Sequence, residues 1–176
     1  QIVRTLHKDG YKVIIHCHQS EEIAQALCHE LNSKRNSSAQ VVVADLGDNE
    51  AIKKLTQTIK SLDLLVNNAS VFYPTSTENS TIDDWDKIIN INLKAPFFLA
   101  TGLSKVLANS QGVIVNIIDI HSDRPLKNFS IYNISKAGLK MLTKTLAKEL
   151  APNIRVNGIS PGSILWPQDK SQLSDI

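Results

Sequence analysis

The chain has 176 residues, which is enough for one domain with a proper hydrophobic core and too few for two full domains. Apolar residues make up 42% and charged residues 20%, as in an ordinary soluble globular protein. The net charge is only +2 and the basic residues are scattered, so we expect one domain over residues 1–176 that binds neither nucleic acid nor membrane.

The first third of the chain alternates between predicted helices and strands. Residues 1–10 have the pattern of the tail of a helix, and the β-branched apolar run 12–17 predicts a strand. Ser20 begins a helix to about residue 34, with Glu21 and Glu22 in the first turn, where they favour the positive end of the helix dipole. A strand over 40–44, a helix over 49–60 and a strand over 62–66 follow.

The remainder continues the alternation. After a loop over 70–80, Thr81 caps a helix expected to reach about residue 109, and Pro96 predicts a kink or irregular turn within it. Strands are predicted over 113–118 and 155–159, with a helix over 130–150 between them. Short links between strands and helices imply right-handed crossovers and a parallel sheet covered on both faces. The predicted fold is α/β, a doubly wound, Rossmann-like sheet in three αβα layers.

Cysteine usage and the ends of the chain give further expectations. Cys17 and Cys28 make neither a disulfide framework nor a CxxC pattern, and no metal site is expected. Without a signal peptide or a run of about 20 apolar residues, the sequence predicts a cytoplasmic protein. Gln1 is not an initiator residue, and residues 174–176 add neither a cap nor a closing strand. We therefore expect that pieces are missing at both ends, including the first strand and its glycine-rich loop.

The motif Tyr132-Asn-Ile-Ser-Lys136 carries the clearest chemistry. Its Tyr and Lys are four residues apart at the start of a predicted helix, so they share a face. An ammonium group stabilises a phenolate and would lower the pKa of Tyr132 from about 10 toward the range of a general acid. Taken alone, a Tyr-x3-Lys pair is common by chance, and a solvated helix surface is its better interpretation.

Other residues accompany this motif in order. Residues 67–69 read Asn-Asn-Ala at a strand end, Asn92 lies in the following helix, Asp119 ends the next strand, and Pro161-Gly162 follows the one after. With these marks, nearly the whole chain resembles the short-chain dehydrogenase/reductase family. The resemblance implies that Asn92, Asp119, Tyr132 and Lys136 are catalytic, with Asn92 positioning a water that feeds Lys136.

Two departures point to one branch of that family. Asp119 stands where the family usually has Ser, and Ser70 stands where it usually has Gly. Both changes are similar to the pteridine reductases, as are residues 71–74, 119–126 and 161–167, the last two in bacterial members. The resemblance implies that the substrate contacts are Ser70, Phe72, Asp119, Tyr132 and Trp166.

A pterin is flat and rich in hydrogen-bonding groups, so its binding site needs an aromatic lid and a polar edge. Phe72 would cover the ring, and Asp119 would accept from its amino group or hold Tyr132. Each residue also has a structural interpretation: Asp119 as a turn or cap residue, Phe72 as a loop anchor, Trp166 as a core residue. His121 lies close by and is interpreted as an incidental loop histidine.

The cofactor prediction is NADPH. In dinucleotide folds an acid at the end of the second strand binds the ribose 2′-hydroxyl of NAD, and this chain has no acid there before Glu21. His18 and Ser20 could donate to a 2′-phosphate, although the branch suggests Arg where Gln19 stands, which removes a bidentate partner. Asp45, whose alternative role is a strand-end turn, would lie with Leu46 around the adenine. The remaining cofactor contacts implied by the resemblance are Asn68, Ala69, Ser70, Tyr132, Lys136, Pro161, Gly162, Ser163 and Ile164.

The predicted function is NADPH-dependent reduction of 7,8-dihydropterins, dihydrofolate or both to their tetrahydro forms. A carbonyl reductase of the same family, acting for example on a 3-oxoacyl thioester, is the first alternative, and a non-catalytic dinucleotide-binding domain is the second. The resemblance also implies a homotetramer formed through the helices of residues 81–109 and 130–150. The apolar residues that could serve its interface, or equally pack on the sheet, are Ile88, Ile91, Phe98, Leu139, Leu142 and Leu146.

Overall fold

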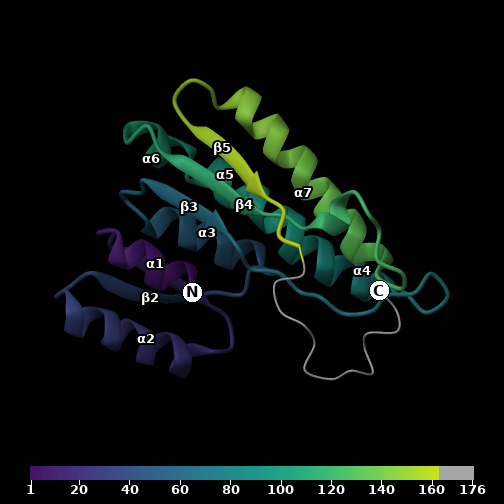
Figure 1. Cartoon of the computed structure of the whole chain (residues 1–176), viewed down its shortest axis with the longest axis horizontal. Helices are drawn as coiled ribbons and strands as arrows, with labels where there is room; N and C mark the ends of the chain where they lie inside the picture. Colours follow the sequence, from purple (N-terminus) through teal and green to yellow (C-terminus); the bar gives the residue numbers. More distant parts are fainter. Residues whose placement is uncertain (163–176) are drawn as a thin grey trace. The chain divides into compact units, whose positions relative to one another are not determined.

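A computed structural model describes residues 1–162 of the chain (Figure 1). The chain divides into two compact units, Gln1–Thr58 and Ile59–Ile176. That residues 1–176 form one domain stays a prediction. Three residues assigned from the sequence to the cofactor or the substrate, Ser163, Ile164 and Trp166, lie outside the described residues.

The first unit contains two parallel strands and three helices. Its elements are α1 (Ile2–Lys8), β1 (Val13–Cys17), α2 (Glu21–Lys34), β2 (Ala39–Val43) and α3 (Asn49–Thr58). The strands pair in parallel, with Val13 opposite Ala39 and Cys17 opposite Val43. Buried side chains of β1 and α2 form the core of this unit: Val13, Ile15, Ala24, Cys28 and Leu31. The predicted helix tail, strands and helices all occur, with ends shifted by a few residues.

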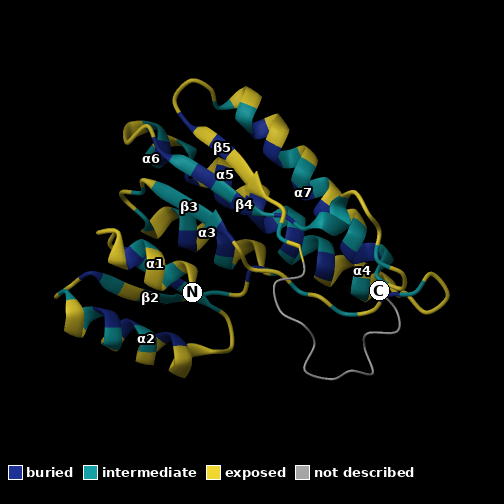
Figure 2. Ribbon diagram, viewed as in Figure 1, coloured by how far each residue is buried: buried dark blue, intermediate teal, exposed yellow. Residues whose placement is uncertain are grey.

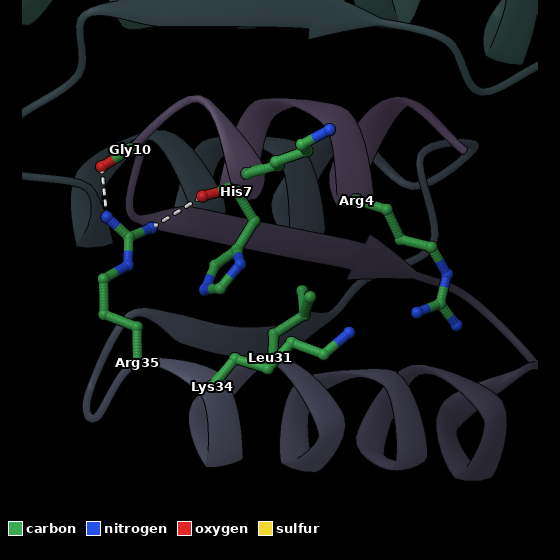
Figure 3. A pocket seen from close by; sticks show the side chains of 7 residues that line it. Arg4, His7, Gly10, Leu31, Lys34 and Arg35 are labelled. Carbon is green, nitrogen blue, oxygen red and sulfur yellow. Dashed lines mark hydrogen bonds between the residues drawn. The ribbon is translucent and has the colours of Figure 1, made fainter.

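A cavity of about 490 Å³ lies between α1 and α2 (Figure 3). Three of its basic side chains, Arg4, Lys34 and Arg35, make hydrogen bonds within this unit. Arg35 donates to the main-chain carbonyl oxygens of His7, Gly10 and Tyr11, where α1 ends and the chain turns toward β1. Arg4 and Lys34 share the carboxylate of Glu30, and these hydrogen bonds lower the pKa of Glu30 to about 2. The cavity is therefore a structural junction between two helices.

The second unit contains a three-stranded parallel sheet in the order β3 (Leu64–Asn67), β4 (Val113–Ile117), β5 (Arg155–Ile159). Between β3 and β4 the chain forms α4 (Ile82–Ile89), η1 (Asn90–Lys94), α5 (Ala95–Gly102) and α6 (Ser104–Asn109). After β4 come η2 (Ile120–Ser122) and α7 (Ser130–Glu149). Helix α7 packs against β5, α4 and η1 (Figure 1).

The long helix predicted from Thr81 to residue 109 begins as expected and is then interrupted. Thr81 and Asp84 form a capping box at the start of α4. The irregular turn predicted at Pro96 is confirmed: η1 is a π-helical turn, closed by a hydrogen bond from the N–H of Ala95 to the carbonyl of Asn90. Since Pro96 has no N–H for the carbonyl of Asn92, the regular α-helical ladder cannot continue through this point.

The apolar residues of the predicted helices could either pack inside the protein or serve a subunit interface, and their burial distinguishes the two. Ile88 is 0% exposed, and Leu139 and Leu146 are each 2% exposed, so these three pack inside the unit. In Figure 2 the residues of α7 alternate between buried and exposed along the helix. Phe98 differs, because 48% of its surface is exposed. Parallel strands flanked by helices confirm the predicted Rossmann-like α/β fold.

Candidate active site

The hydroxyl of Tyr132 and the carboxylate of Asp119 meet in the second unit. Tyr132 lies in the first turn of α7, and Asp119 follows β4 as the N-cap residue of η2. The Tyr132 hydroxyl donates to Oδ2 of Asp119 at 2.7 Å, and the N–H of His121 donates to Oδ1 at 2.9 Å. Asp119 is thus a cap and a partner of Tyr132 at once, because its two oxygens serve different donors.

The surroundings raise the pKa of Tyr132 above its ordinary value of 10.0. Burial is the largest cause, since only 5% of the residue is exposed, and the hydrogen bond to Asp119 and its charge add to the effect. The lowering expected from Lys136 is therefore wrong for this structure. The carboxylate is at hydrogen-bond distance, whereas Nζ of Lys136 lies 5.6 Å from the centre of the Tyr132 ring. Tyr132 is a neutral phenol at neutral pH, able to give up a proton.

Lys136 is buried one helical turn after Tyr132. It is 3% exposed, and its Nζ donates to the carbonyl oxygen of Ile117, at the end of β4, at 3.0 Å. Burial lowers the pKa of Lys136, and the charge of Asp119 offsets part of that lowering. Tyr132, Lys136 and Asp119 are therefore one electrostatically connected group.

Asn92 is buried in the π-helical turn, where its side chain holds a loop. Its Oδ1 accepts from the N–H of Val71 at 2.8 Å, and its Nδ2 donates to the carbonyl of Val71 at 3.0 Å and to Oγ of Ser135 at 3.1 Å. Ser135 in turn donates to the carbonyl of Tyr132 at 2.7 Å. Both amide hydrogens of Asn92 are used in this way, so its side chain connects the loop after β3 to α7.

Phe72 lies against the ring of Tyr132. The two ring centres are 4.7 Å apart in an edge-to-face arrangement, and Phe72 also stacks on Phe129, at 4.4 Å with 14° between the planes. Phe72 nevertheless remains 55% exposed. The structure thus brings an aromatic ring from the loop after β3 to the phenol of α7.

A chain of buried polar groups joins the strands to α7. Asn67 and Asn116 are register partners on β3 and β4, and Nδ2 of Asn67 donates to Oδ1 of Asn116 at 2.8 Å. Nδ2 of Asn116 donates to Oγ1 of Thr143 at 2.9 Å, and Thr143 donates to the carbonyl of Leu139 at 2.8 Å. These bonds fix the ends of β3 and β4 relative to the helix that carries Tyr132 and Lys136.

The other residues predicted in this unit have less defined surroundings. Asn68, Ala69 and Ser70 follow β3 and are exposed. The carbonyl of Pro161 accepts from the N–H of Ile120 at 3.2 Å, which ties the turn after β5 to the residue next to Asp119. At Gly162, which is also exposed, a Cβ would meet nothing within 4 Å.

The residues predicted to select the cofactor lie in the first unit. His18, Gln19 and Ser20 follow β1 and are exposed, and the hydroxyl of Ser20 makes no capping bond at the start of α2. Nε2 of His18 lies 3.9 Å from Oδ2 of Asp45, and Oδ1 of Asp45 accepts from the N–H of Gly47 at 2.8 Å. Asp45 is therefore a turn residue, as its alternative interpretation held. The Asp45 carboxylate is also an acid close to His18, which the residues between β1 and Glu21 do not reveal by themselves.

Three residues near Tyr132 were not identified from the sequence. Ser135 lies within the Tyr-x3-Lys motif, and the aromatic character of Phe129, three residues before Tyr132, could have drawn attention to it. Thr75, which is 3% exposed, has no recognisable local pattern. Its contacts with α7 depend on residues more than fifty positions away.

Within residues 1–162, no three His, Cys, Asp or Glu side chains converge as a metal site would require. Within the same residues, no helix combines the length and apolarity needed to cross a bilayer.

Comparisons with known proteins identify the family of the chain. A sequence profile described as short chain dehydrogenase matches residues 1–175. Pteridine reductase 1 of Leishmania tarentolae is 32% identical over 212 aligned residues, which cover 96% of this chain and 73% of that protein. The 3beta-hydroxysteroid dehydrogenase 1 of Eggerthella lenta is 30% identical, covering 99% and 69% respectively. An uncharacterized oxidoreductase of Staphylococcus aureus is 30% identical, covering 93% and 71%. The chain therefore belongs to the short chain dehydrogenase family of oxidoreductases, which use nicotinamide dinucleotide cofactors.

Proposed function

We propose that the protein reduces 7,8-dihydropterins, dihydrofolate or both to their tetrahydro forms, with NADPH as the cofactor. The observation that carries the proposal is the 2.7 Å hydrogen bond from Tyr132 to the carboxylate of Asp119, beside the exposed ring of Phe72. A carboxylate, a protonated phenol that can donate, and an aromatic face are the groups that a flat, hydrogen-bonding heterocycle requires. The 32% identity to a pteridine reductase supports the same substrate class.

Three side chains of the second unit, Tyr132, Asp119 and Lys136, have separate roles in the reaction. Tyr132, neutral because its pKa is raised, holds the proton at Oη and delivers it to a ring nitrogen of the substrate. Each oxygen of Asp119 accepts one hydrogen bond and retains a lone pair, so the carboxylate can still accept from an amino group of a pterin. Lys136 supplies a positive charge 5.6 Å from the ring of Tyr132, which limits the cost of the phenolate left after proton transfer.

The residues after β1 fit a phosphate group. NADPH, when bound, supplies the hydride. An imidazole, an amide and an unbonded hydroxyl are exposed together at His18, Gln19 and Ser20, and all three can donate to a 2′-phosphate. The carboxylate of Asp45, whose Oδ2 lies 3.9 Å from Nε2 of His18, would repel a phosphate, so the three donors have to offset that charge. Lys136 would hold the ribose of the nicotinamide half.

The test is a turnover assay that follows NADPH absorbance with dihydrobiopterin, dihydromonapterin and dihydrofolate. The same substrates are offered with NADH, and two carbonyl substrates, a 3-oxoacyl thioester and a 3-oxosteroid, are included. Turnover of at least one pterin or folate, faster with NADPH, is the expected result. The proposal fails if none of the three is reduced while a carbonyl substrate is.

A carbonyl reductase is the second candidate, favoured by the 30% identity to a hydroxysteroid dehydrogenase. Here Asp119 is the discriminating residue, because a developing alkoxide is stabilised by a neutral donor such as serine and not by a carboxylate. Asp119→Ser is therefore expected to lower pterin turnover about tenfold or more and to raise turnover of the 3-oxoacyl thioester. Asp123→Ser, which removes a nearby carboxylate paired with Lys140, is the matched control and should change neither rate.

We also propose that the protein forms a homotetramer through α5 and α7. Apolar side chains remain exposed on these helices: Phe97 at 39%, Phe98 at 48%, Ile134 at 48% and Met141 at 61%. Light scattering coupled to size-exclusion chromatography should give the mass of four chains. A double charge substitution, Phe98→Glu with Met141→Glu, should reduce that mass, and a single-chain mass for the unsubstituted protein would contradict the proposal.

A further inference from the structure

Thr75 connects the loop after β3 to the first turn of α7 through three hydrogen bonds. Its N–H donates to the carbonyl of Asn128 at 2.6 Å, and its own carbonyl accepts from the N–H of Ser130 at 3.2 Å. Its Oγ1 accepts from the N–H of Ile131, also at 3.2 Å. Thr75 is 3% exposed, so these bonds are shielded from water.

The first turn of α7 needs such a partner. The first four N–H groups of a helix have no acceptor within the helix, and a Ser, Thr, Asp or Asn at the N-cap commonly supplies one. In α7 the N-cap is Phe129, which makes no side-chain capping bond. The hydroxyl of Thr75 takes the place of such a cap, because it accepts from the N–H of Ile131, 56 residues later in the chain. A residue of another loop thus caps the helix.

The same turn carries Tyr132, and the same loop carries Phe72. Phe129, the N-cap itself, stacks on Phe72 at 4.4 Å, while Tyr132 packs on Phe72 in an edge-to-face arrangement and donates to Asp119. The loop and the helix are therefore joined at the main chain by Thr75 and at the side chains by the two phenylalanines.

We propose that Thr75 is a positioning residue, which holds the loop of Phe72 and the first turn of α7 in one register so that the Phe72 ring and the Tyr132 hydroxyl face the substrate together. The inference rests on the proposed function for its kinetic consequence, although the contact itself does not depend on which substrate is used. Thr75 acts through other residues and touches neither the substrate nor the cofactor.

Loss of the hydroxyl leaves the N–H of Ile131 buried without its acceptor, so the first turn loosens and Tyr132 moves. Proton transfer is sensitive to displacement, and a shift of about 1 Å can cost about a hundredfold in rate. Thr75→Val, which keeps the branched shape and removes the hydroxyl, is expected to lower kcat for a dihydropterin about 10- to 100-fold. The KM for NADPH should stay within about twofold, since the residues after β1 are untouched. Thr75→Ser restores the hydroxyl and should restore kcat.

The matched control is Thr77→Val, the same substitution two residues later at an exposed position. A second variant, Phe129→Leu, removes the stacked ring and leaves the main-chain bonds. It should also lower kcat, and it replaces Thr75→Val as the test if that variant does not fold. Unchanged kcat in Thr75→Val, or in Phe129→Leu when the former does not fold, overturns the proposal. So does a loss of kcat that Thr75→Ser does not restore.

A structural readout separates this proposal from the proposed function. The chain has 3 tyrosines, so carbon-13 labelling of tyrosine gives few ring signals, which Tyr11→Phe and Tyr73→Phe assign. The ring of Phe72 should shift the Tyr132 signals in the unsubstituted protein, and Thr75→Val should move them while leaving those of Tyr11, in the other unit, in place. If the unsubstituted protein reduces no pterin, the proposed function fails and these signals alone decide: moved Tyr132 signals support the role of Thr75, and unmoved signals overturn it.

Discussion

Replacement of Tyr132 by phenylalanine is expected to lower kcat for dihydropterin reduction by about 10² to 10⁴, the usual contribution of a general acid. The substitution removes one oxygen atom and leaves the ring that packs on Phe72. Substrate and cofactor should therefore still bind, with KM values changed by less than about threefold. Steady-state kinetics with both substrates varied give the two constants separately.

The pH dependence sharpens this expectation. Burial and Asp119 raise the pKa of Tyr132, so the phenol keeps its proton as the pH rises past 10.0, the ordinary value. The reduction rate should not fall through ionisation of Tyr132 below that pH. Tyr11→Phe, at a residue 43% exposed in the other unit, is the matched control and should behave like the unsubstituted protein. Full activity of Tyr132→Phe would remove Tyr132 from the mechanism.

Replacement of Asn116 by alanine is expected to lower the free energy of unfolding by roughly 2–4 kcal/mol. Asn116 is 0% exposed, and its amide is bonded on one side to Asn67 and on the other to Thr143. Without it, the Nδ2 of Asn67 loses its acceptor inside the protein, which costs about 1–3 kcal/mol, and the vacated space adds a packing loss. Thr143 is less affected, since its hydroxyl still donates to the carbonyl of Leu139.

Thermal unfolding and urea titration measure this effect. For a chain of this size, the loss should appear as a fall in Tm of roughly 5–15 °C. Asn109→Ala, at an exposed position at the end of α6, removes the same amide and should change Tm by no more than about 1–2 °C. Equal stability of the two variants would show that the buried amide chain contributes little.

Much of the fold could be predicted from local patterns. The apolar run of β1, the capping box at Thr81 and the interruption at Pro96 are each encoded within a few residues. The polar residues after β3, β4 and β5 gather at one edge of the parallel sheet, and there Asp119 meets Tyr132 from the first turn of α7. The candidate site could thus be located from spacing, strand order and the resemblance.

What escaped prediction depends on contacts between distant parts of the chain. The pKa of Tyr132 is raised first by burial and then by the carboxylate at 2.7 Å from its hydroxyl, whereas Nζ of Lys136 lies 5.6 Å from the ring centre. Sequence spacing gives neither distance. Thr75 becomes a helix cap only because its loop returns to α7, and Asp45 approaches His18 only because β1 and β2 are parallel. Such effects belong to tertiary packing.

The exposure of Phe72 has a consequence for ligand affinity. With 55% of the residue still in contact with water, about half of the gain from burying a phenylalanine, roughly 1–1.5 kcal/mol, is not yet realised. A planar molecule laid on that face would recover it, which corresponds to about a five- to tenfold lower Kd. A bent or aliphatic molecule of equal polarity would leave part of the ring hydrated. The Phe72 side chain would therefore favour planar ligands over non-planar ones, whatever their charge.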